Sequence, residues 1–226
     1  MSVPHHRVLL AEFLGTALLL AVVVGSGHMG ETLAAGNAAI ALLANSTATG
    51  LALWWLIVLF GPISGAQFNP LVTITLAASG ELPWRSALGI VIAQCLGAVA
   101  GVMLAHAMFG LPWLMEGIKL RASPGLWLSE VVATAGLMLT ILLGRQRAAP
   151  ALPALIAAYI AAAYWFTAST SFANPAVTLA RAFTATFAGI RLVDVPAFVA
   201  AQIIGTVVAI GLARALSGAA PSRAIP

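Results

Sequence analysis

The sequence predicts an all-α membrane protein with six transmembrane helices and two re-entrant half-helices, arranged as an inverted 3+3 repeat. The first observation is composition: 62% of the 226 residues are hydrophobic and 7% are charged, whereas soluble domains average roughly 25% charged residues. The second is a set of six apolar runs that each reach the ~20 residues needed to cross a bilayer. The third is a near-duplicated hexapeptide, at 69–74 and 174–179, which indicates two similar halves.

The transmembrane helices follow from the apolar runs in chain order. The first run is too long for the core of a signal peptide, so we expect it to be a membrane span. Two further segments, about 69–79 and 174–184, are too short to span and too apolar for surface loops. Half-helices entering from opposite sides explain them, because such backbone survives only inside protein or beside a cavity. The six spans are expected near residues 8–28, 37–60, 84–109, 126–144, 151–169 and 195–217.

Each half-helix is expected to start at an Asn-Pro pair. Residues 69–74 read Asn-Pro-Leu-Val-Thr-Ile, and residues 174–179 read Asn-Pro-Ala-Val-Thr-Leu. Asn caps the first free N–H groups, and Pro at the first helical position loses no hydrogen bond. A helix that starts in mid-membrane points N–H donors and a positive dipole end at its surroundings. Two such starts are the pattern of a transport protein whose site lies at the bilayer midplane.

The halves match in order, as repeat one (about 7–110) and repeat two (about 120–217) of a single channel domain covering 1–226. Each half opens with an acidic residue inside an apolar run, Glu12 in the first and Glu130 in the second. Three spans per half is an odd number, so the second repeat must be inverted relative to the first.

Matching residues also mark the third and sixth spans. Gln94 is followed by Gly97 in the third span, and Gln202 is followed by Gly205 in the sixth. Small residues let helices approach closely in lipid, so these glycines, with Gly101, predict helix contacts.

Several function classes are excluded by what the chain lacks. The net charge is +4, but the basic residues are scattered singly, which argues against nucleic acid as a partner. One cysteine, Cys95, excludes a disulfide framework. No cluster of His, Asp or Glu has metal-ligand spacing, so neither a metal nor another cofactor is expected. Ser169 and Ser171 have no paired base nearby, and the sequence predicts no enzyme.

Positive charges predict the orientation. A slight excess on one side of the expected spans favours cytoplasmic termini. That side carries Arg7, Arg85, Arg145, Arg147, Arg214 and Arg223, and the other carries Lys119, Arg121, Arg181 and Arg191.

These features amount to a family resemblance. Residues 63–70 read Ile-Ser-Gly-Ala-Gln-Phe-Asn-Pro. The chain therefore resembles the aquaporin and aquaglyceroporin family of major intrinsic proteins over roughly 7–217, with Gln67 in place of the usual His. The resemblance implies an aquaporin-like fold, a pore through each monomer, a homotetramer in membrane lipid, and passive flow of water and small neutral solutes.

The resemblance also assigns roles along the pore. Asn69 and Asn174 would meet at the pore centre, beside Leu71 and Ala176, each with a free NH2 donor for a passing oxygen. Leu71 replaces the usual Ala, so its side chain either splays the half-helices or points sideways into a gap. Glu12 and Glu130 would brace the loops before the half-helices, and Gln67 would lie in the inner vestibule.

The selectivity filter departs from the family pattern. Counting from the two Asn residues, its four positions are Thr49, Ala162, Ser171 and Val177. Almost all relatives carry Arg at the position of Val177, and water-selective members carry Phe and His at the first two. We expect a wide, uncharged constriction that passes glycerol, urea and neutral hydroxylated metalloids. Arg181 lies one turn beyond Val177 and is expected to face a neighbouring helix or the loop.

A narrower resemblance concerns bacterial aquaglyceroporins associated with arsenic resistance, which also lack the filter Arg. It implies a multi-pass protein of a bacterial inner (plasma) membrane that carries arsenite and methylated arsenicals. Alternatives stay open: mainly a water channel, an ion-coupled secondary transporter, or a junction protein without conduction. A transporter would need a coupling site, for which the membrane interior offers only Glu12 and Glu130.

Overall fold

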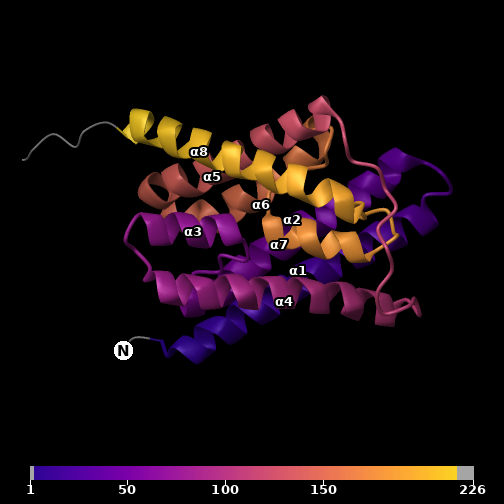
Figure 1. The fold of residues 1–226 in the computed structure, drawn as a ribbon, viewed down its shortest axis with the longest axis horizontal. Coiled ribbons are helices and arrows are strands. Elements are labelled where there is room, and N and C mark those ends of the chain that lie inside the picture. The colour runs from indigo at the N-terminus through magenta and orange to yellow at the C-terminus, as the bar shows by residue number, and fades with distance from the viewer. Residues whose placement is uncertain (1–2, 218–226) are drawn as a thin grey trace, which may run out of the picture.

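The computed structural model describes residues 3–217, so Arg223 lies outside the described residues. Figure 1 shows a bundle of long helices with two short helices, α3 and α7, inside it. The long helices are α1 (His5–Leu33), α2 (Ala38–Ser64), α4 (Trp84–Met108), α5 (Pro124–Arg147), α6 (Leu152–Phe166) and α8 (Val195–Ser217). The short helices are α3 (Pro70–Ala78) and α7 (Pro175–Ala180).

The predicted fold class is confirmed. The described residues contain six helices that are long and apolar enough to cross a membrane. The half-helices α3 and α7 point from opposite ends of the bundle toward its middle (Figure 1). Several bounds differ from expectation: α1 and α2, for example, end at Leu33 and Ser64 rather than near residues 28 and 60. The fifth span ends at Phe166, and the second half-helix ends at Ala180 with a 3-10 turn over Arg181–Phe183.

Capping residues explain where the helices begin. Asn37 accepts hydrogen bonds from the backbone N–H groups of residues 39 and 40 at the start of α2. Ser123 precedes Pro124, the first residue of α5, and its side chain accepts a hydrogen bond from the Leu126 backbone N–H. Asn69 and Asn174 cap α3 and α7, each followed by Pro at the first helical position. These helix starts are therefore encoded locally, as the Asn-Pro pairs predict.

Small residues bring the helices of each repeat together. A Cβ atom added at Gly101 of α4 would collide with the carbonyl oxygen of Ala17 in α1. One added at Gly97 would meet the Phe13 carbonyl, and one at Gly205 of α8 would meet the Val131 carbonyl of α5. The α1–α4 and α5–α8 contacts thus depend on glycine, and the predicted helix contacts are confirmed.

The outer surface of the bundle is apolar, as a multi-pass membrane protein requires. Large hydrophobic side chains are exposed along the long helices, for example Leu51, Leu88, Leu128 and Val207. Polar and charged side chains are instead buried in the interior, among them Glu12, Gln94, Glu130 and Gln202. The interior of the bundle, rather than its surface, is where a functional site must be sought.

Candidate functional site

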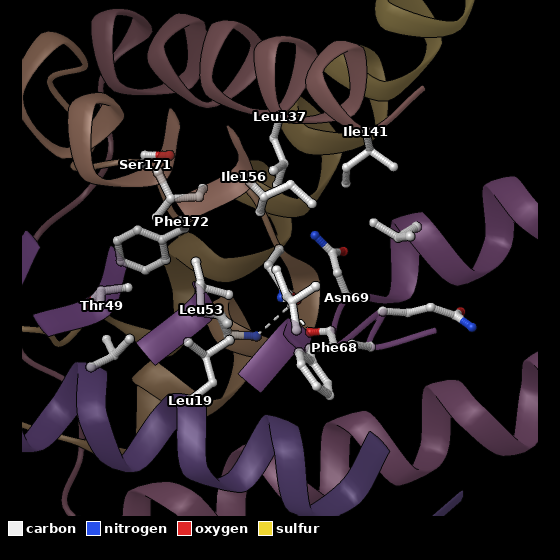
Figure 2. A pocket seen from close by; sticks show the side chains of 18 of the residues that line it. Leu19, Thr49, Leu53, Phe68, Asn69, Leu137, Ile141, Ile156, Ser171 and Phe172 are labelled. Carbon is white, nitrogen blue, oxygen red and sulfur yellow. Dashed lines mark hydrogen bonds between the residues drawn. The ribbon is translucent and has the colours of Figure 1, made fainter. Parts of the chain in front are cut away.

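A cavity of about 220 Å³ is lined by residues from both half-helices and from α1, α2, α5 and α6. Figure 2 shows Asn69 between apolar side chains of α5 and α6 on one side and of α1 and α2 on the other. Gln67 and Arg145 line one end, which we call the Gln67 end. Thr49, Ser171 and Val177 line the other, which we call the filter end.

The two capping asparagines cross-link the repeats at the middle of the cavity. The Asn69 Nδ2 donates to the carbonyl oxygen of Ala173 at 2.8 Å, and the Asn174 Nδ2 donates to that of Phe68 at 2.7 Å. Each side-chain oxygen accepts a backbone N–H of its own half-helix. The expectation of a free NH2 group is therefore corrected. Each amide has two N–H bonds, one is used across the repeat, and one remains for a solute.

The loops before the asparagines share an unusual backbone. Ala66 and Phe68 have φ of 48° and 48°, and Ser171 and Ala173 have φ of 49° and 48°. These positions lie three and one residues before each Asn, so the strained conformation repeats with the sequence. None is glycine, and a non-glycine residue in the left-handed region costs roughly 1–2 kcal/mol. Such strain persists only where the surroundings hold it.

Glu12 supplies that support in the first repeat. Its Oε1 accepts from the Gln67 backbone N–H at 2.9 Å and from the Ser64 hydroxyl at 2.6 Å. Its Oε2 accepts from the Phe68 backbone N–H and from the Gln94 Nε2, both at 2.8 Å. The carboxylate is fully buried. The contacts are those expected of a loop brace.

Glu130 repeats the arrangement in the second half. Its Oε1 accepts from the Phe172 N–H at 2.9 Å, and its Oε2 accepts from the Ala173 N–H at 2.9 Å and from the Gln202 Nε2 at 2.7 Å. The sequence matched Gln94 and Gln202 but gave them no role. Each amide also donates to a threonine of the half-helix, Thr73 or Thr178, and so joins the carboxylate to that helix.

Three of the four expected filter residues gather at the filter end. Thr49, Ser171 and Val177 all line the cavity and are nearly fully buried. Figure 2 shows Thr49, Ser171 and Phe172 together at one end of the view. The Tyr164 hydroxyl donates to the Thr49 hydroxyl at 3.3 Å, and Tyr164 also lines the cavity.

The expectation for Ala162 is wrong. Ala162 is exposed, whereas Ile156, Ile160 and Tyr164 line the cavity at four-residue spacing along α6. Residues two positions apart on a helix differ by about 200° in direction. Ala162 and Tyr164 therefore point to opposite sides. Counting back from Asn174 gives a sequence position but does not fix how α6 is rotated.

Arg181 contacts the loop, as expected, but it also lines the cavity, which was not expected. Its Nε donates to the Ala188 carbonyl oxygen, and its Cζ lies 3.4 Å from the centre of the Phe172 ring. The filter end therefore contains a buried guanidinium, and the expectation of a wholly uncharged constriction is corrected.

The remaining pore-centre residues do not line the cavity. Leu71 and Ala176 are buried, and neither is among the residues that line the cavity. The sideways orientation considered for Leu71 therefore fits the structure, and its side chain does not narrow the middle. Gln67 does line its end of the cavity, and its Nε2 donates to the Ser64 carbonyl oxygen at 3.2 Å.

A charged pair lies near the Gln67 end. The Arg145 Nη2 and the Glu81 Oε2 are 2.5 Å apart, and both side chains are partly exposed. Hydrogen bonds from Arg145, and next from Ser79, lower the pKa of Glu81 below its ordinary value. The Glu81 carboxylate thus stays ionised at neutral pH.

Comparisons with known proteins agree with this geometry. The family model described as "MIP: Major intrinsic protein" matches residues 1–149. The chain is 55% identical to "Aquaglyceroporin AqpS" of Rhizobium meliloti (strain 1021) over 90% of this chain and 87% of the relative. It is 30% identical to a "Probable glycerol uptake facilitator protein" of Thermotoga maritima over 68% of this chain and 71% of the relative. Among solved structures, the aquaglyceroporin from Plasmodium falciparum has the same fold, with a TM-score of 0.70 at 22% identity over 93% of this chain and 94% of that one.

Proposed function

Because the chain belongs to the major intrinsic protein family, whose aquaglyceroporins are passive channels and not enzymes, we propose that it conducts small neutral solutes larger than water. The solutes are polyols such as glycerol, urea, and neutral hydroxylated metalloids such as arsenous acid, together with water. The path is the cavity between the two half-helices.

The observation that carries the proposal is the presence of Thr49, Ser171 and Val177 at the filter end. Short side chains at these positions leave room for a solute wider than water. Tyr164 and Phe172 also line the cavity, so aromatic surface lies beside the hydroxyl groups of Thr49 and Ser171. This combination suits a solute with an apolar carbon side and a hydroxylated side. The aromatic rings can contact the carbon atoms, and the polar side chains can hydrogen-bond the hydroxyl groups.

The half-helices support passage of neutral rather than cationic solutes. The N-terminal ends of α3 and α7 both lie at the cavity centre, where Asn69 and Asn174 line it. Their aligned peptide dipoles place positive potential there, which opposes cations and protons. One remaining N–H on each Asn can hold the oxygen of a passing solute.

The burial of the acidic residues argues against an ion-coupled transporter. Glu12 and Glu130 accept hydrogen bonds on both carboxylate oxygens, and neither residue lines the cavity. A coupling carboxylate must exchange an ion with the transport path. A channel predicts flux that rises linearly with solute concentration, and saturating flux would favour the transporter.

We place the protein in a bacterial inner membrane as a homotetramer with cytoplasmic termini. Of the four basic residues at the filter end of the bundle, Arg121 and Arg181 are buried, Arg191 pairs with Asp194 at 2.9 Å, and Lys119 is exposed. The opposite end presents several arginines near helix ends, including Arg7 and Arg147. The excess of free positive charge at that end supports a cytoplasmic location for it.

Stopped-flow uptake of glycerol and arsenous acid into proteoliposomes tests the proposal. Wild type is compared with Val177→Arg, which adds bulk and charge, and with Val177→Leu, which adds bulk alone. We expect rapid uptake of both solutes by wild type, strong loss in Val177→Arg, and a smaller loss in Val177→Leu. Water flux without entry of either solute in wild type would contradict the proposal and favour a water channel.

A further inference from the structure

We infer that Arg181, in the 3-10 turn that follows the second half-helix, is the cationic member of the filter and forms with Ser171 a polar subsite for oxygen-bearing solutes. The inference rests on the proposed function, because it names the groups that select the solute. Val177 leaves the ordinary filter position without charge. Arg181 comes four residues after Val177. At a rise of about 1.5 Å per residue, it lies about 6 Å from Val177 along the helix axis.

The first argument is an unpaired donor. Arg181 is 2% exposed and lines the cavity, and its Nη1 is buried without a hydrogen-bond partner among residues 3–217. Native proteins leave few buried polar groups unpaired, and a charged one is the most costly. Because Arg181 lines the cavity, we assign the missing acceptor of Nη1 to a water or solute molecule that enters this end.

The second argument is that the guanidinium is held in place. Its Nε donates to the Ala188 carbonyl oxygen, and its Cζ lies over the Phe172 ring, 3.4 Å from the ring centre. A cation over an aromatic face is attracted by the ring quadrupole, more strongly when desolvated. These contacts fix the side chain while leaving Nη1 unpaired, so the donor is already oriented before a solute arrives.

Ser171 supplies the second polar group. It lines the same end of the cavity and is 3% exposed, and its Oγ also lacks a partner in the described part of the chain. Its backbone is held in the left-handed region by its loop. Arg can only donate a hydrogen bond, whereas a serine hydroxyl can donate or accept. The pair therefore recognises carbonyl or hydroxyl oxygens: polyols, urea-like amides and hydroxylated oxoacids.

The charges around Arg181 leave this end of the cavity positive. Arg121 lies 4.7 Å from the same Phe172 ring, and Glu130 is engaged by backbone N–H groups and Gln202. Asp194 pairs with Arg191 and accepts the Arg121 backbone N–H. Three guanidinium groups thus face two carboxylates, and no carboxylate among the described residues pairs with Arg181. The filter is wide and still opposes cations.

The test compares two permeants of nearly equal shape. Urea is neutral and guanidinium carries one positive charge, so the ratio of their permeabilities in proteoliposomes reports charge selection. We expect Arg181→Met to raise the guanidinium-to-urea ratio by about tenfold or more, since a unit charge at short range in a partly desolvated site is worth at least that. Arg181→Lys keeps the charge and is expected to keep the exclusion of guanidinium.

Lys119→Met is the matched control. It removes one positive charge at the same end of the molecule, but Lys119 is a surface residue with a partly buried amine and does not line the cavity. Its ratio should stay within about twofold of wild type, because solvent and salt screen a charge at the surface, outside the permeation path. Arg181→Gln, which keeps an N–H donor for Ala188, serves as the neutral variant if the Met variant does not assemble.

A second variant tests the serine. Ser171→Ala should lower urea and glycerol permeability relative to water and leave the exclusion of guanidinium intact. An unchanged guanidinium-to-urea ratio in both neutral Arg181 variants, with normal urea flux, would overturn the inference while leaving the proposed function standing. Wild type that passes water but neither urea nor glycerol would overturn the proposed function itself, and the subsite with it.

Discussion

Glu12 shows how one buried side chain sets the geometry of a loop. We expect Glu12→Ala to destabilise the protein by at least about 3 kcal/mol, because it leaves several buried donors without an acceptor. Among them are the backbone N–H groups of Gln67 and Phe68. Thermal unfolding of the detergent-solubilised protein measures the effect. Glu31→Ala in the same helix, where the side chain is exposed, is the control. Equal melting of the two variants would refute the bracing role.

Lys119 has an unusual titration that can be followed directly. Partial burial of its amine, then repulsion from Arg121 and Arg181, lowers the pKa of Lys119 to about 8. The amine lies 4.6 Å from the centre of the Phe187 ring. Lys119 is therefore protonated below pH 8 and loses its charge as pH rises through that value. It is the sole lysine of the chain, so peptide mapping can follow its acylation alone. The rate of acylation should rise with pH, with a midpoint near pH 8. Arg181→Met should move the midpoint upward, and a midpoint near the ordinary ~10.4 would contradict this account.

At the residue scale, the sequence predicted the residues that belong to the duplicated motif. It missed residues whose placement depends on how a helix is rotated and where it ends. Asn69, Asn174 and the two acids follow from the duplicated pattern. Ala162 and Arg181 do not, because the orientation of α6 and the end of α7 are set by tertiary packing. None of the four left-handed loop residues before the asparagines is glycine, so the sequence does not indicate their conformation. Hydrogen bonds to the two buried glutamates explain how this strained backbone is held.

At the element scale, glycine positions control how closely α1 and α4 approach. Gly101→Ala should destabilise the protein by about 1–3 kcal/mol, the usual cost of overpacking, because the added Cβ meets the Ala17 carbonyl. Gly211→Ala in α8, where nothing lies within 4 Å of an added Cβ, should be neutral or stabilising by up to about 1 kcal/mol. Thermal unfolding in detergent compares them. A neutral Gly101→Ala would show that the α1–α4 contact can relax.

The element bounds show where sequence reasoning is strong and where it stops. All six spans and both half-helices were predictable, since length, apolarity and Asn-Pro starts are local signals. The ends of α6 and α7 were not. The end of α6 at Phe166 leaves a loop before Asn174 whose backbone N–H groups at Phe172 and Ala173 reach Glu130, a contact between distant parts of the chain. The end of α7 at Ala180 is followed by Arg181, whose side chain contacts the Ala188 carbonyl oxygen in a later loop.

At the scale of the whole molecule, the placement of Lys119 predicts a sidedness that can be measured. A membrane-impermeant amine reagent should label Lys119 in intact cells, because the proposed orientation puts the filter end outside. The same reagent should reach the N-terminal amine only after the membrane is opened. Labelling of Lys119 that requires permeabilised cells would reverse the proposed orientation without affecting the fold.

The crossed hydrogen bonds at the cavity centre also have a consequence for biogenesis. Asn69 donates to a carbonyl 104 residues later in the chain, and Asn174 donates to one 106 residues earlier. At about 5–20 residues per second of synthesis, the ribosome delivers the second partner about 5–20 s after the first. During that interval the Asn69 amide nitrogen lacks its partner in the second repeat, while its side-chain oxygen already caps its own half-helix. We therefore expect the two repeats to be joined at the cavity centre only after residue 174 has been synthesised.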